Sequence, residues 1–476
     1  MLFNSLDFLI FFIIVTTLYF VIPHNKRWIL LLISSCYFYM AFVPIYILIL
    51  GFTIVIDYFA GILIENSEGK RRKLFLILSL IANIGVLAVF KYHNFLNENL
   101  TFLMHGFGLS NPIPYLSIIL PIGLSFYTFQ AMSYTIEVYR GNQKAERHFG
   151  IFSLYIMFYP LLLAGPIERP YNLLPQLRIK QDFEYTRVVE GLRLMLWGLF
   201  KKLVIADRLA IYVNAVYNNY EAHNGTTLIL ASIFFTFQIY CDFSGYSDMA
   251  IGAAKVMGIK LMNNFNRPYF SRSMSEFWKR WHISLSSWFR DYVYITLGGN
   301  RVSIPRWYLN LFIVFLISGL WHGANWTYVI WGALNGFYLI FAIISQGFRN
   351  KAKRLVGLDK LPWLNNLLEV MITFALSSFA WIFFRANHVT DAFGIIKKIA
   401  TSRGSLFIES PSMMIYSFLG LFILFLVEFK KEYYKGKFSF FNNEKWIIRA
   451  LSCCFLIITI LLFGVFDGGQ FIYFQF

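Results

Sequence analysis

Apolar runs of about twenty residues recur from one end of the chain to the other. Of its 476 residues, 58% are hydrophobic and only 14% are charged, and the mean hydropathy is +0.58. A soluble domain carries roughly a quarter charged residues, whereas a helix that crosses a bilayer needs about 20 mostly apolar residues. The runs are continuous rather than alternating, which argues against a transmembrane barrel. The sequence predicts an all-α polytopic membrane protein with about 10–12 crossings plus re-entrant and interfacial helices.

No soluble domain, low-complexity linker or short repeat interrupts the apolar runs. We therefore expect a single integral membrane domain over residues 1–476, with peripheral N-terminal helices at about 1–115, a motif-bearing core at about 117–346, and C-terminal helices with a tail at about 363–476. The four cysteines lie in apolar surroundings without metal-ligand spacing, which predicts reduced packing residues. No metal site and no bound cofactor are expected.

Basic residues give the chain a formal net charge of +17 and gather in the loops between apolar runs. In a soluble protein this excess would suggest nucleic acid, but the positive-inside rule explains it in a membrane protein. We expect membrane lipid, and no nucleic acid, as a partner. The basic cluster at 70–73 and the pair Lys26 and Arg27 place their loops in the cytoplasm, so both termini are predicted to be extracytoplasmic. The segment 149–164 lies between basic stretches and is expected to be re-entrant.

The stretch 267–306 mixes aromatic residues with arginine and lysine. Its apolar positions recur at spacings of three and four, at Trp278, Trp281, Leu285 and Trp288. This periodicity predicts one amphipathic helix in the cytoplasmic interface, which would be either a simple anchor or part of a functional surface. His282 lies on that helix. By itself it is typical of a surface histidine, and a polar group on a substrate path is the alternative.

One histidine stands in the apolar stretch WHGANWTYVIWG, which runs from Trp321 to Gly332. His322 follows an apolar run of only about fourteen residues, which is short for a complete crossing. Gly319 and Gly323 loosen the backbone beside it, so we expect His322 at a break in the helix, facing protein or a water-filled cavity. An imidazole suits general-base work near neutral pH. A structural histidine that a neighbour satisfies is an equal alternative.

Two carboxylates, Asp242 and Asp248, stand inside the apolar segment IYCDFSGYSDMAIG. Carboxylates within a membrane need partners and often mark a functional site. Gly245 lies between them, so we expect the helix to break there. A structural pair with arginine or tyrosine is the alternative to a functional role.

Two further stretches combine polar and aromatic side chains. LPIGLSFYTFQ, at 120–130, contains Tyr127 and Gln130, and would either line a tunnel or make hydrogen bonds between helices. The terminal FIYFQF has four aromatic residues among six, and Tyr473 carries its only hydroxyl. Water is an unfavourable environment for such a tail, so we expect it to anchor in the membrane interface or to fold back into a cavity.

Together these stretches resemble the membrane-bound O-acyltransferase family, and more narrowly its bacterial branch of alginate and peptidoglycan O-acetyltransferases, with the D-alanyl transferase of teichoic acid as a more distant relative. The resembling stretches stand in order over 120–476: LPIGLSFYTFQ, LLAGPIERP, YCDFSGYSDMAIG, FNRPYFSRSMSEFWKRWHISLSSWFRDYVYITLGGNR, LWHGANWTYVIWG and FIYFQF. The resemblance implies a helical bundle around a transmembrane tunnel in a bacterial inner (cytoplasmic) membrane.

The resemblance also implies roles for individual residues. His322 would be the catalytic histidine, His282 the second family histidine, and Tyr473 the tyrosine that accepts the acyl group and presents it outside. Other residues would line or support the tunnel: Asp242, Asp248, Tyr127, Gln130, Trp321 and Asn325. The donor would be acetyl-CoA or another acyl thioester in the cytoplasm, and the acceptor a cell-surface or exported polysaccharide. The implied partner is an extracytoplasmic acetyl-transferring protein of the SGNH type.

Two other classes of protein compete with an acyltransferase. Buried carboxylates and broken helices would suit a proton-coupled transporter or flippase of a polysaccharide export system, although the sequence has no repeated halves. A catalytically silent scaffold of an export complex would not need the two histidines. Loss of function in His322→Ala with normal folding would separate an enzyme from a scaffold.

Overall fold

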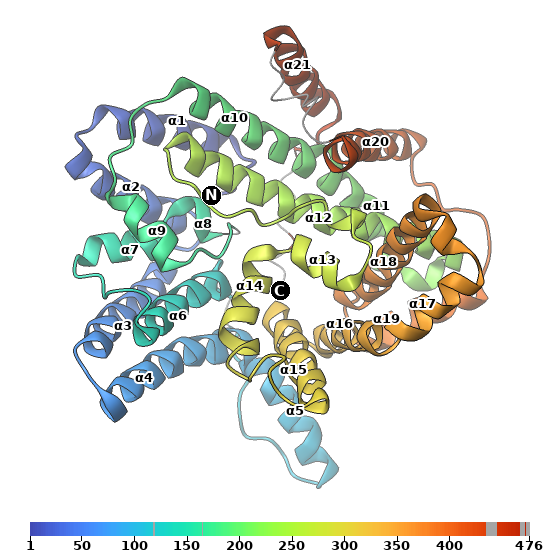
Figure 1. Ribbon diagram of the computed structural model, residues 1–476, viewed down its shortest axis with the longest axis horizontal. Helices are drawn as coiled ribbons and strands as arrows, with labels where there is room; N and C mark the ends of the chain where they lie inside the picture. Colours follow the sequence, from blue (N-terminus) through green and yellow to red (C-terminus); the bar gives the residue numbers. More distant parts are fainter. Residues whose placement is uncertain (118–119, 164, 435–444, 467–471, 473–476) are drawn as a thin grey trace. The chain divides into compact units, whose positions relative to one another are not determined.

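The computed structural model describes residues 1–117, 120–163, 165–434, 445–466 and 472. Within these residues every regular element is helical and no strand occurs (Figure 1). Eight helices there are long and apolar enough to cross a membrane, and the shorter apolar α1 (Leu6–Val21) is additional. The predicted all-α polytopic architecture is confirmed, with eight such helices in the described part of the chain where the sequence suggested about ten to twelve crossings.

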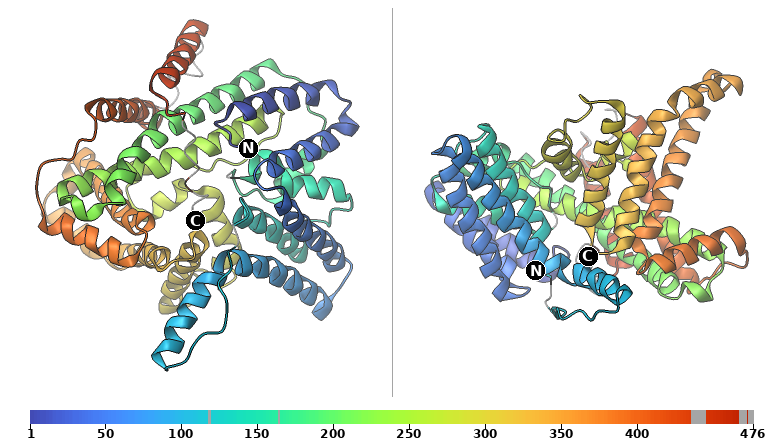
Figure 2. Two further views of the ribbon diagram at one scale, coloured as in Figure 1. Left: turned by 180° about the vertical axis from the view of Figure 1, so that it is seen from behind. Right: turned by 90° about the horizontal axis from the view of Figure 1, so that it is seen from below.

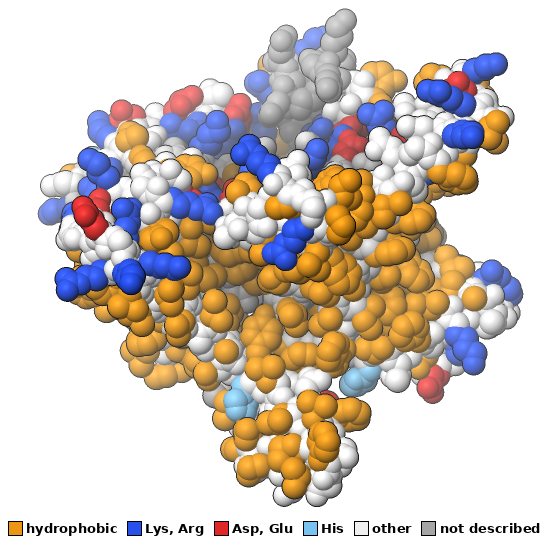
Figure 3. Space-filling view, turned by 60° about the horizontal axis from the view of Figure 1, so that its bottom comes forward, with side chains coloured by type: hydrophobic (Ala, Val, Ile, Leu, Met, Phe, Trp, Pro, Cys, Tyr) orange, Lys and Arg blue, Asp and Glu red, His pale blue; other side chains and the backbone are white. Residues whose placement is uncertain are grey.

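The eight apolar helices differ in how much of their surface other helices cover. They are Pro44–Glu65, which includes α3 (Ile47–Glu65); Gly69–Gly106, which includes α4 (Gly69–Leu87) and α5 (His93–Gly106); α12 (Gly225–Val256); α15 (Ile304–His322); α16 (Trp326–Ile344); α18 (Pro362–Arg385); α20 (Pro411–Tyr433); and α21 (Trp446–Phe463). In α12, 78% of the apolar window is buried, against 17–39% in the other seven. Figure 3 shows the wide hydrophobic areas that result on one face, with groups of Lys and Arg side chains beside them. Such areas are suited to lipid rather than to water.

The chain divides into two compact units. Unit 1 contains Met1–Met195 and Tyr246–Met262, and unit 2 contains Leu196–Gly245 and Asn263–Phe476. Both α10 (Tyr185–Phe200) and α12 contribute residues to each unit. These boundaries differ from the three sections expected from the sequence, and a single domain stays a prediction.

Unit 1 contains most of the N-terminal helices. Besides α1, α3, α4 and α5 they are α2 (His24–Met40), α6 (Leu124–Arg140), α7 (Phe149–Met157), α8 (Tyr159–Leu162) and α9 (Pro170–Arg178). A polar cluster joins α3, α4 and α6: Asp57 accepts hydrogen bonds from Ser79 Oγ (2.6 Å) and Asn83 Nδ2 (2.9 Å), and Ser79 Oγ also lies 3.2 Å from Thr135 Oγ1. Helices α7 and α8 are each too short to cross a bilayer, and the re-entrant course of 149–164 stays a prediction.

Unit 2 contains the antiparallel pair α15 and α16, which lie side by side (Figure 2). Its other elements are the π-helix η3 (Lys201–Ala206), α11 (Asp207–Tyr217), α13 (Met274–Arg280), α14 (Ile283–Phe289), α17 (Gln346–Leu355), α18, α19 (Val389–Thr401), α20 and α21. A Cβ atom on Gly332 would lie 2.4 Å from the Phe315 carbonyl oxygen, and one on Gly319 would lie 3.2 Å from Gly332 Cα. Glycine at both positions therefore permits the close approach of the two backbones.

The helix break expected at Gly245 is wrong, because α12 continues through it to Val256. A Cβ atom on Gly245 would lie 2.8 Å from the Gly198 carbonyl oxygen and 3.3 Å from the Lys202 nitrogen. The glycine thus lets α10 and η3 pack against α12 without ending it. Interhelical contact, rather than backbone flexibility, is the physical reason for this residue.

The single amphipathic helix expected around Trp278 to Trp288 is also wrong. Helix α13 ends at Arg280 and α14 begins at Ile283, and between them the backbone of His282 has a φ of 42°. A left-handed backbone is uncommon for a residue other than glycine. The turn carries the histidine inward, where it is only 1% exposed, so it is not a surface histidine.

Candidate active site

His322 is the last residue of α15, where the chain turns into α16. Gly323 has an extended backbone, and a Cβ atom there would lie 2.1 Å from the Tyr328 ring. The side chain of Asn325 then accepts a hydrogen bond from the Thr327 nitrogen (3.0 Å) and caps α16. Helix capping of this kind satisfies a backbone donor that has no partner within the helix. The sequence thus located the break correctly, and Asn325 contributes to it as a cap.

The imidazole of His322 is 3% exposed and lies among aromatic rings. Its centroid is 4.9 Å from that of Trp321, 5.0 Å from that of Trp331 and 5.3 Å from that of Phe384, each in edge-on geometry. These rings come from α15, α16 and α18. Three helices of unit 2 therefore build one aromatic enclosure around the imidazole of His322.

Asn264 orients the second histidine. His282 Nδ1 lies 3.0 Å from Asn264 Oδ1, and Ser284 Oγ donates to the same oxygen at 2.9 Å. The backbone oxygen of Asn264 also accepts from the Ile283 nitrogen (2.9 Å), at the start of α14. Burial lowers the pKa of His282 to about 3, so the ring is neutral at physiological pH. Since Oδ1 can only accept, Nδ1 carries the proton and Nε2 is the acceptor atom of the ring.

Trp321 joins the surroundings of the two histidines. Its ring centroid lies 6.1 Å from that of His282 and 4.9 Å from that of His322. The two histidines are forty positions apart in the sequence, and the fold of unit 2 places both beside the indole ring of Trp321. Both histidines are buried among aromatic rings. His282 also contacts Phe243, and the centroids of these two rings lie 4.6 Å apart. Unit 2 therefore contains a buried two-histidine site.

Asp242 takes part in a buried ion-pair cluster. Its Oδ1 lies 2.6 Å from Lys202 Nζ, which also lies 2.7 Å from Asp207 Oδ1. The neighbouring Lys201 Nζ donates to Ser244 Oγ at 2.8 Å. Asp242 is therefore paired with a lysine, not with the arginine or tyrosine that the sequence suggested.

Sequence reasoning missed Lys201, Lys202 and Asn264. The two lysines stand in the otherwise apolar GLFKKLVIA, and charged side chains inside an apolar run need partners. That signal could have linked them to the carboxylates of α12. Asn264 lies in the polar loop segment NNFNRP, where nothing in the sequence distinguishes it from its neighbours.

Three predicted residues belong to unit 1. Tyr127 and Gln130 lie buried on α6, where Gln130 Nε2 donates to the Tyr155 carbonyl oxygen (2.5 Å). Asp248 is partly buried on the part of α12 in unit 1. Their role in a tunnel stays a prediction, as does that of Tyr473, which lies outside the described residues.

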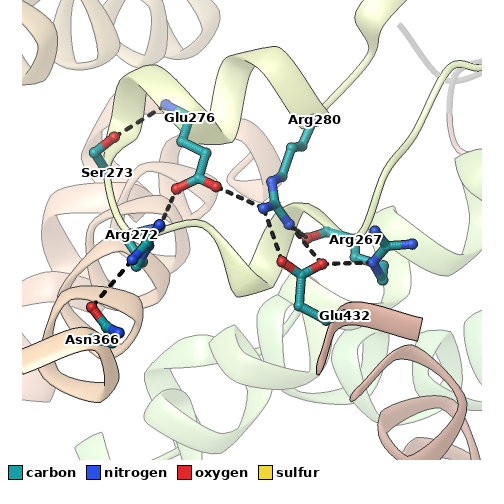
Figure 4. Close-up of polar contacts among 7 residues, drawn as sticks. All are labelled: Arg267, Arg272, Ser273, Glu276, Arg280, Asn366 and Glu432. Carbon is teal, nitrogen blue, oxygen red and sulfur yellow. Dashed lines mark hydrogen bonds and ion pairs between the residues drawn. The ribbon is translucent and has the colours of Figure 1, made fainter. Parts of the chain in front are cut away.

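A charged network holds α13 against the ends of α18 and α20 (Figure 4). Arg280 binds both oxygens of Glu432 (2.9 and 3.0 Å) and one of Glu276 (2.7 Å), while Arg267 Nε donates to Glu432 at 2.7 Å. Arg272 extends the network to Asn366 on α18, at 3.2 Å. These ion pairs hold α13, which lies in the chain between Asn264 and His282, against α20. Among the described residues, no three His, Cys, Asp or Glu side chains gather to hold a metal ion.

A family model described as MBOAT, the membrane-bound O-acyltransferase family, matches residues 148–384. The probable alginate O-acetylase AlgI of Pseudomonas aeruginosa is 40% identical over 397 residues, which cover 82% of this chain and 73% of the relative. This chain belongs to the membrane-bound O-acyltransferase family. The matched region contains both histidines and Asp242, and the predicted resemblance is confirmed.

Two other relatives of this MBOAT protein act on different cell-surface polymers according to their names. The peptidoglycan O-acetyltransferase of Helicobacter pylori is 32% identical over 503 residues, covering 95% of this chain and 91% of the relative. The teichoic acid D-alanyltransferase of Streptococcus thermophilus is 29% identical over 290 residues, covering 55% of this chain and 68% of the relative. The MBOAT protein is therefore an O-acyltransferase of a multi-pass membrane type, which favours neither the transporter nor the silent scaffold.

Proposed function

We propose that this enzyme moves an acetyl group from a cytoplasmic thioester, acetyl-CoA or another acyl carrier, across the membrane for the O-acetylation of an exported or cell-surface polysaccharide. The observation that supports this reading is the buried two-histidine site beside Trp321. A buried imidazole that contacts aromatic rings suits proton abstraction from a hydroxyl. The names of the relatives support the acetyl group and the polysaccharide acceptor.

In the proposed reaction, His322 acts as the general base. It takes the proton of an acceptor hydroxyl while the hydroxyl oxygen attacks the thioester carbonyl carbon. The C–O bond forms, the C–S bond breaks, and the thiolate leaves with the electron pair of that bond. The proton then passes from His322 to the thiolate, so the histidine returns to its neutral form. His282, with Nδ1 held by Asn264, presents Nε2 as a second acceptor.

The proposed first acceptor is the hydroxyl of Tyr473. An acetylated tyrosine at an extracytoplasmic tail would pass the group to a partner of the SGNH type, which would deliver it to the polysaccharide. The basic loops support this orientation, with donor loops in the cytoplasm and both termini outside. A bacterial inner membrane is the matching location.

The experiment uses the purified 476-residue protein in proteoliposomes, supplied with isotopically labelled acetyl-CoA. The mass of the C-terminal peptide that contains Tyr473 is read for the wild type, His322→Ala, and His105→Ala. His105 lies exposed at the end of α5 and serves as the matched histidine control. Label is expected on the wild type and on the control, and its rate of appearance is expected to fall by roughly 10²–10⁴-fold in His322→Ala.

Different outcomes separate the parts of the proposal. Thioester turnover in the wild type without label on the tail would remove Tyr473 as the acceptor but leave the enzyme. Equal labelling of the wild type and His322→Ala would remove His322 as the base. Neither label nor turnover in the presence of membrane extract would count against the acetyl thioester donor.

A further inference from the structure

Asp242 also contacts the C-terminal segment of the chain. Its second oxygen, Oδ2, accepts a hydrogen bond from the backbone nitrogen of Ile472 at 2.7 Å, across 230 positions of sequence. Ile472 itself is only 5% exposed and packs in the hydrophobic core of unit 2. One carboxylate thus binds a lysine with one oxygen and the main chain of the tail with the other.

The ion pair holds this carboxylate in place. Lys202 Nζ lies between Asp242 Oδ1 (2.6 Å) and Asp207 Oδ1 (2.7 Å), and all three side chains are buried. A buried carboxylate needs a cation or donors to be retained in its ionised form. Since Lys202 occupies Oδ1, Oδ2 is directed to a backbone donor. Charge-assisted hydrogen bonds to ionised acceptors are roughly twice as strong as neutral ones.

Two more main-chain contacts hold the chain just before the tail. The carbonyl oxygen of Leu203, in the π-helix η3, accepts from the Val465 nitrogen at 3.1 Å. The guanidinium of Arg208 donates to the Phe463 carbonyl oxygen, at the end of α21, at 2.7 and 3.0 Å. The contacts at 463, 465 and 472 therefore all fall on one region of unit 2, formed by η3, α11 and α12.

The residue that binds Ile472 is followed on α12 by a residue that contacts the two-histidine site. Phe243 follows Asp242 on α12, and its ring centroid is 4.6 Å from that of His282, at a right angle. One step along a helix therefore separates the residue that binds the tail from a residue that contacts a site histidine. Ile472 in turn precedes Tyr473 in the sequence.

We propose that Asp242, braced by Lys202, is a positioning residue that seats the C-terminal segment beside the two-histidine site through the backbone of Ile472. This inference rests on the proposed function for its purpose, which is to deliver the Tyr473 hydroxyl. Recognition runs through the main chain at residue 472, so the amide is essential and the side chain there contributes only packing. Asp207 shares the same lysine, whereas the described hydrogen bond of the Ile472 amide goes to Asp242.

The first test measures hydrogen exchange at the Ile472 amide, resolved by fragmentation mass spectrometry of the purified full chain. The wild type is compared with Asp242→Leu and with Asp207→Leu. Either substitution removes one carboxylate from Lys202, but only Asp242→Leu removes the acceptor of the Ile472 amide. We expect exchange at Ile472 to be faster by roughly tenfold or more in Asp242→Leu, and close to the wild-type rate in Asp207→Leu.

A second pair of variants covers the case in which Asp242→Leu does not fold. Ile472→Pro removes the amide while leaving the ion pair, and Ile472→Val keeps the amide and most of the packing. Release of C-terminal residues by a carboxypeptidase is expected to be faster in Ile472→Pro than in Ile472→Val. Equal release in these two variants, equal exchange in the wild type and Asp242→Leu, or equal acceleration in both leucine variants would overturn the proposal.

Measuring kcat and KM separates a role of Asp242 in positioning the tail from a general loss of protein structure. It also separates that role from the proposed acetylation of Tyr473. Asp242→Leu should lower kcat for labelling of Tyr473 and leave KM for the acetyl thioester near its wild-type value. A protected Ile472 amide in a wild-type protein that never labels Tyr473 would leave the positioning of the tail standing and would remove its proposed purpose. Unaltered labelling in a folded Asp242→Leu would overturn the positioning role alone.

Discussion

At the scale of single residues, His282 and His322 are buried by two different local backbone structures. His322 ends a long helix, and the glycine after it made that break readable from sequence. His282 depends on a left-handed backbone between two short helices and on an asparagine eighteen positions away. The helical periodicity of the surrounding tryptophans predicted a continuous helix, because periodicity does not record a single residue that departs from it.

The burial of His282 makes a prediction about stability against pH. Its pKa is about 3 in the folded protein and 6.5 when exposed. Above pH 6.5 the ring is neutral in both states and adds no pH dependence. As the pH falls from 6.5 toward 3, the unfolded chain binds a proton that the folded protein excludes, so the free energy of unfolding falls by at most about 1.4 kcal/mol per pH unit.

His282→Gln should therefore be less sensitive to acid than the wild type. The measurement is the thermal midpoint of both proteins in detergent at pH 7 and at pH 4.5. The drop between the two pH values is expected to be smaller in the variant. Equal drops in the two proteins would show that His282 is not held neutral by burial.

At the scale of helices, glycine pairs decide how closely neighbouring elements pack. From the sequence, Gly245 was expected to break α12 and Gly319 to loosen the backbone beside His322. In the structure, each glycine lies where the backbone of another helix comes close. A glycine in an apolar run is compatible with either reading, because its missing side chain serves flexibility and close approach equally. Only the position of the neighbouring helix decides between them.

Gly332→Ala is expected to lower the thermal midpoint, because the added methyl group would meet the Phe315 carbonyl oxygen of α15 at 2.4 Å. Overpacking of this kind typically costs about 1–3 kcal/mol. Gly85→Ala is the matched control, since Gly85 lies in the apolar helix α4 with nothing within 4 Å of an added Cβ atom. The thermal midpoints of the two variants are measured in the same detergent. A loss in Gly85→Ala as large as in Gly332→Ala would contradict the close contact of α15 and α16.

At the scale of the whole molecule, the distribution of basic residues predicts the orientation in the membrane. The cluster at 70–73 lies in the first turns of α4, and the helical run continues through α5 to Gly106. A 38-residue helix of about 1.5 Å per residue is longer than the roughly 30 Å hydrocarbon core. One end should therefore lie in the cytoplasm and the other outside.

Single-cysteine variants test this orientation after the four natural cysteines are replaced by alanine. Lys70→Cys should react with a membrane-impermeant maleimide only in inside-out vesicles, and Gly108→Cys only in right-side-out vesicles. Labelling is read by mass shift. The reverse pattern would invert the proposed topology and place the tail on the donor side.

The sequence by itself determined the helical class, the membrane environment, the family and the break after His322, because hydropathy, charge and glycine spacing are properties of neighbouring residues along the chain. Tertiary structure alone decided the rest. Lys202 meets Asp242 across 40 positions, and Asp242 meets the Ile472 amide across 230. A charged residue in an apolar run indicates that a partner is needed. Which residue becomes that partner depends on how helices distant in sequence pack together.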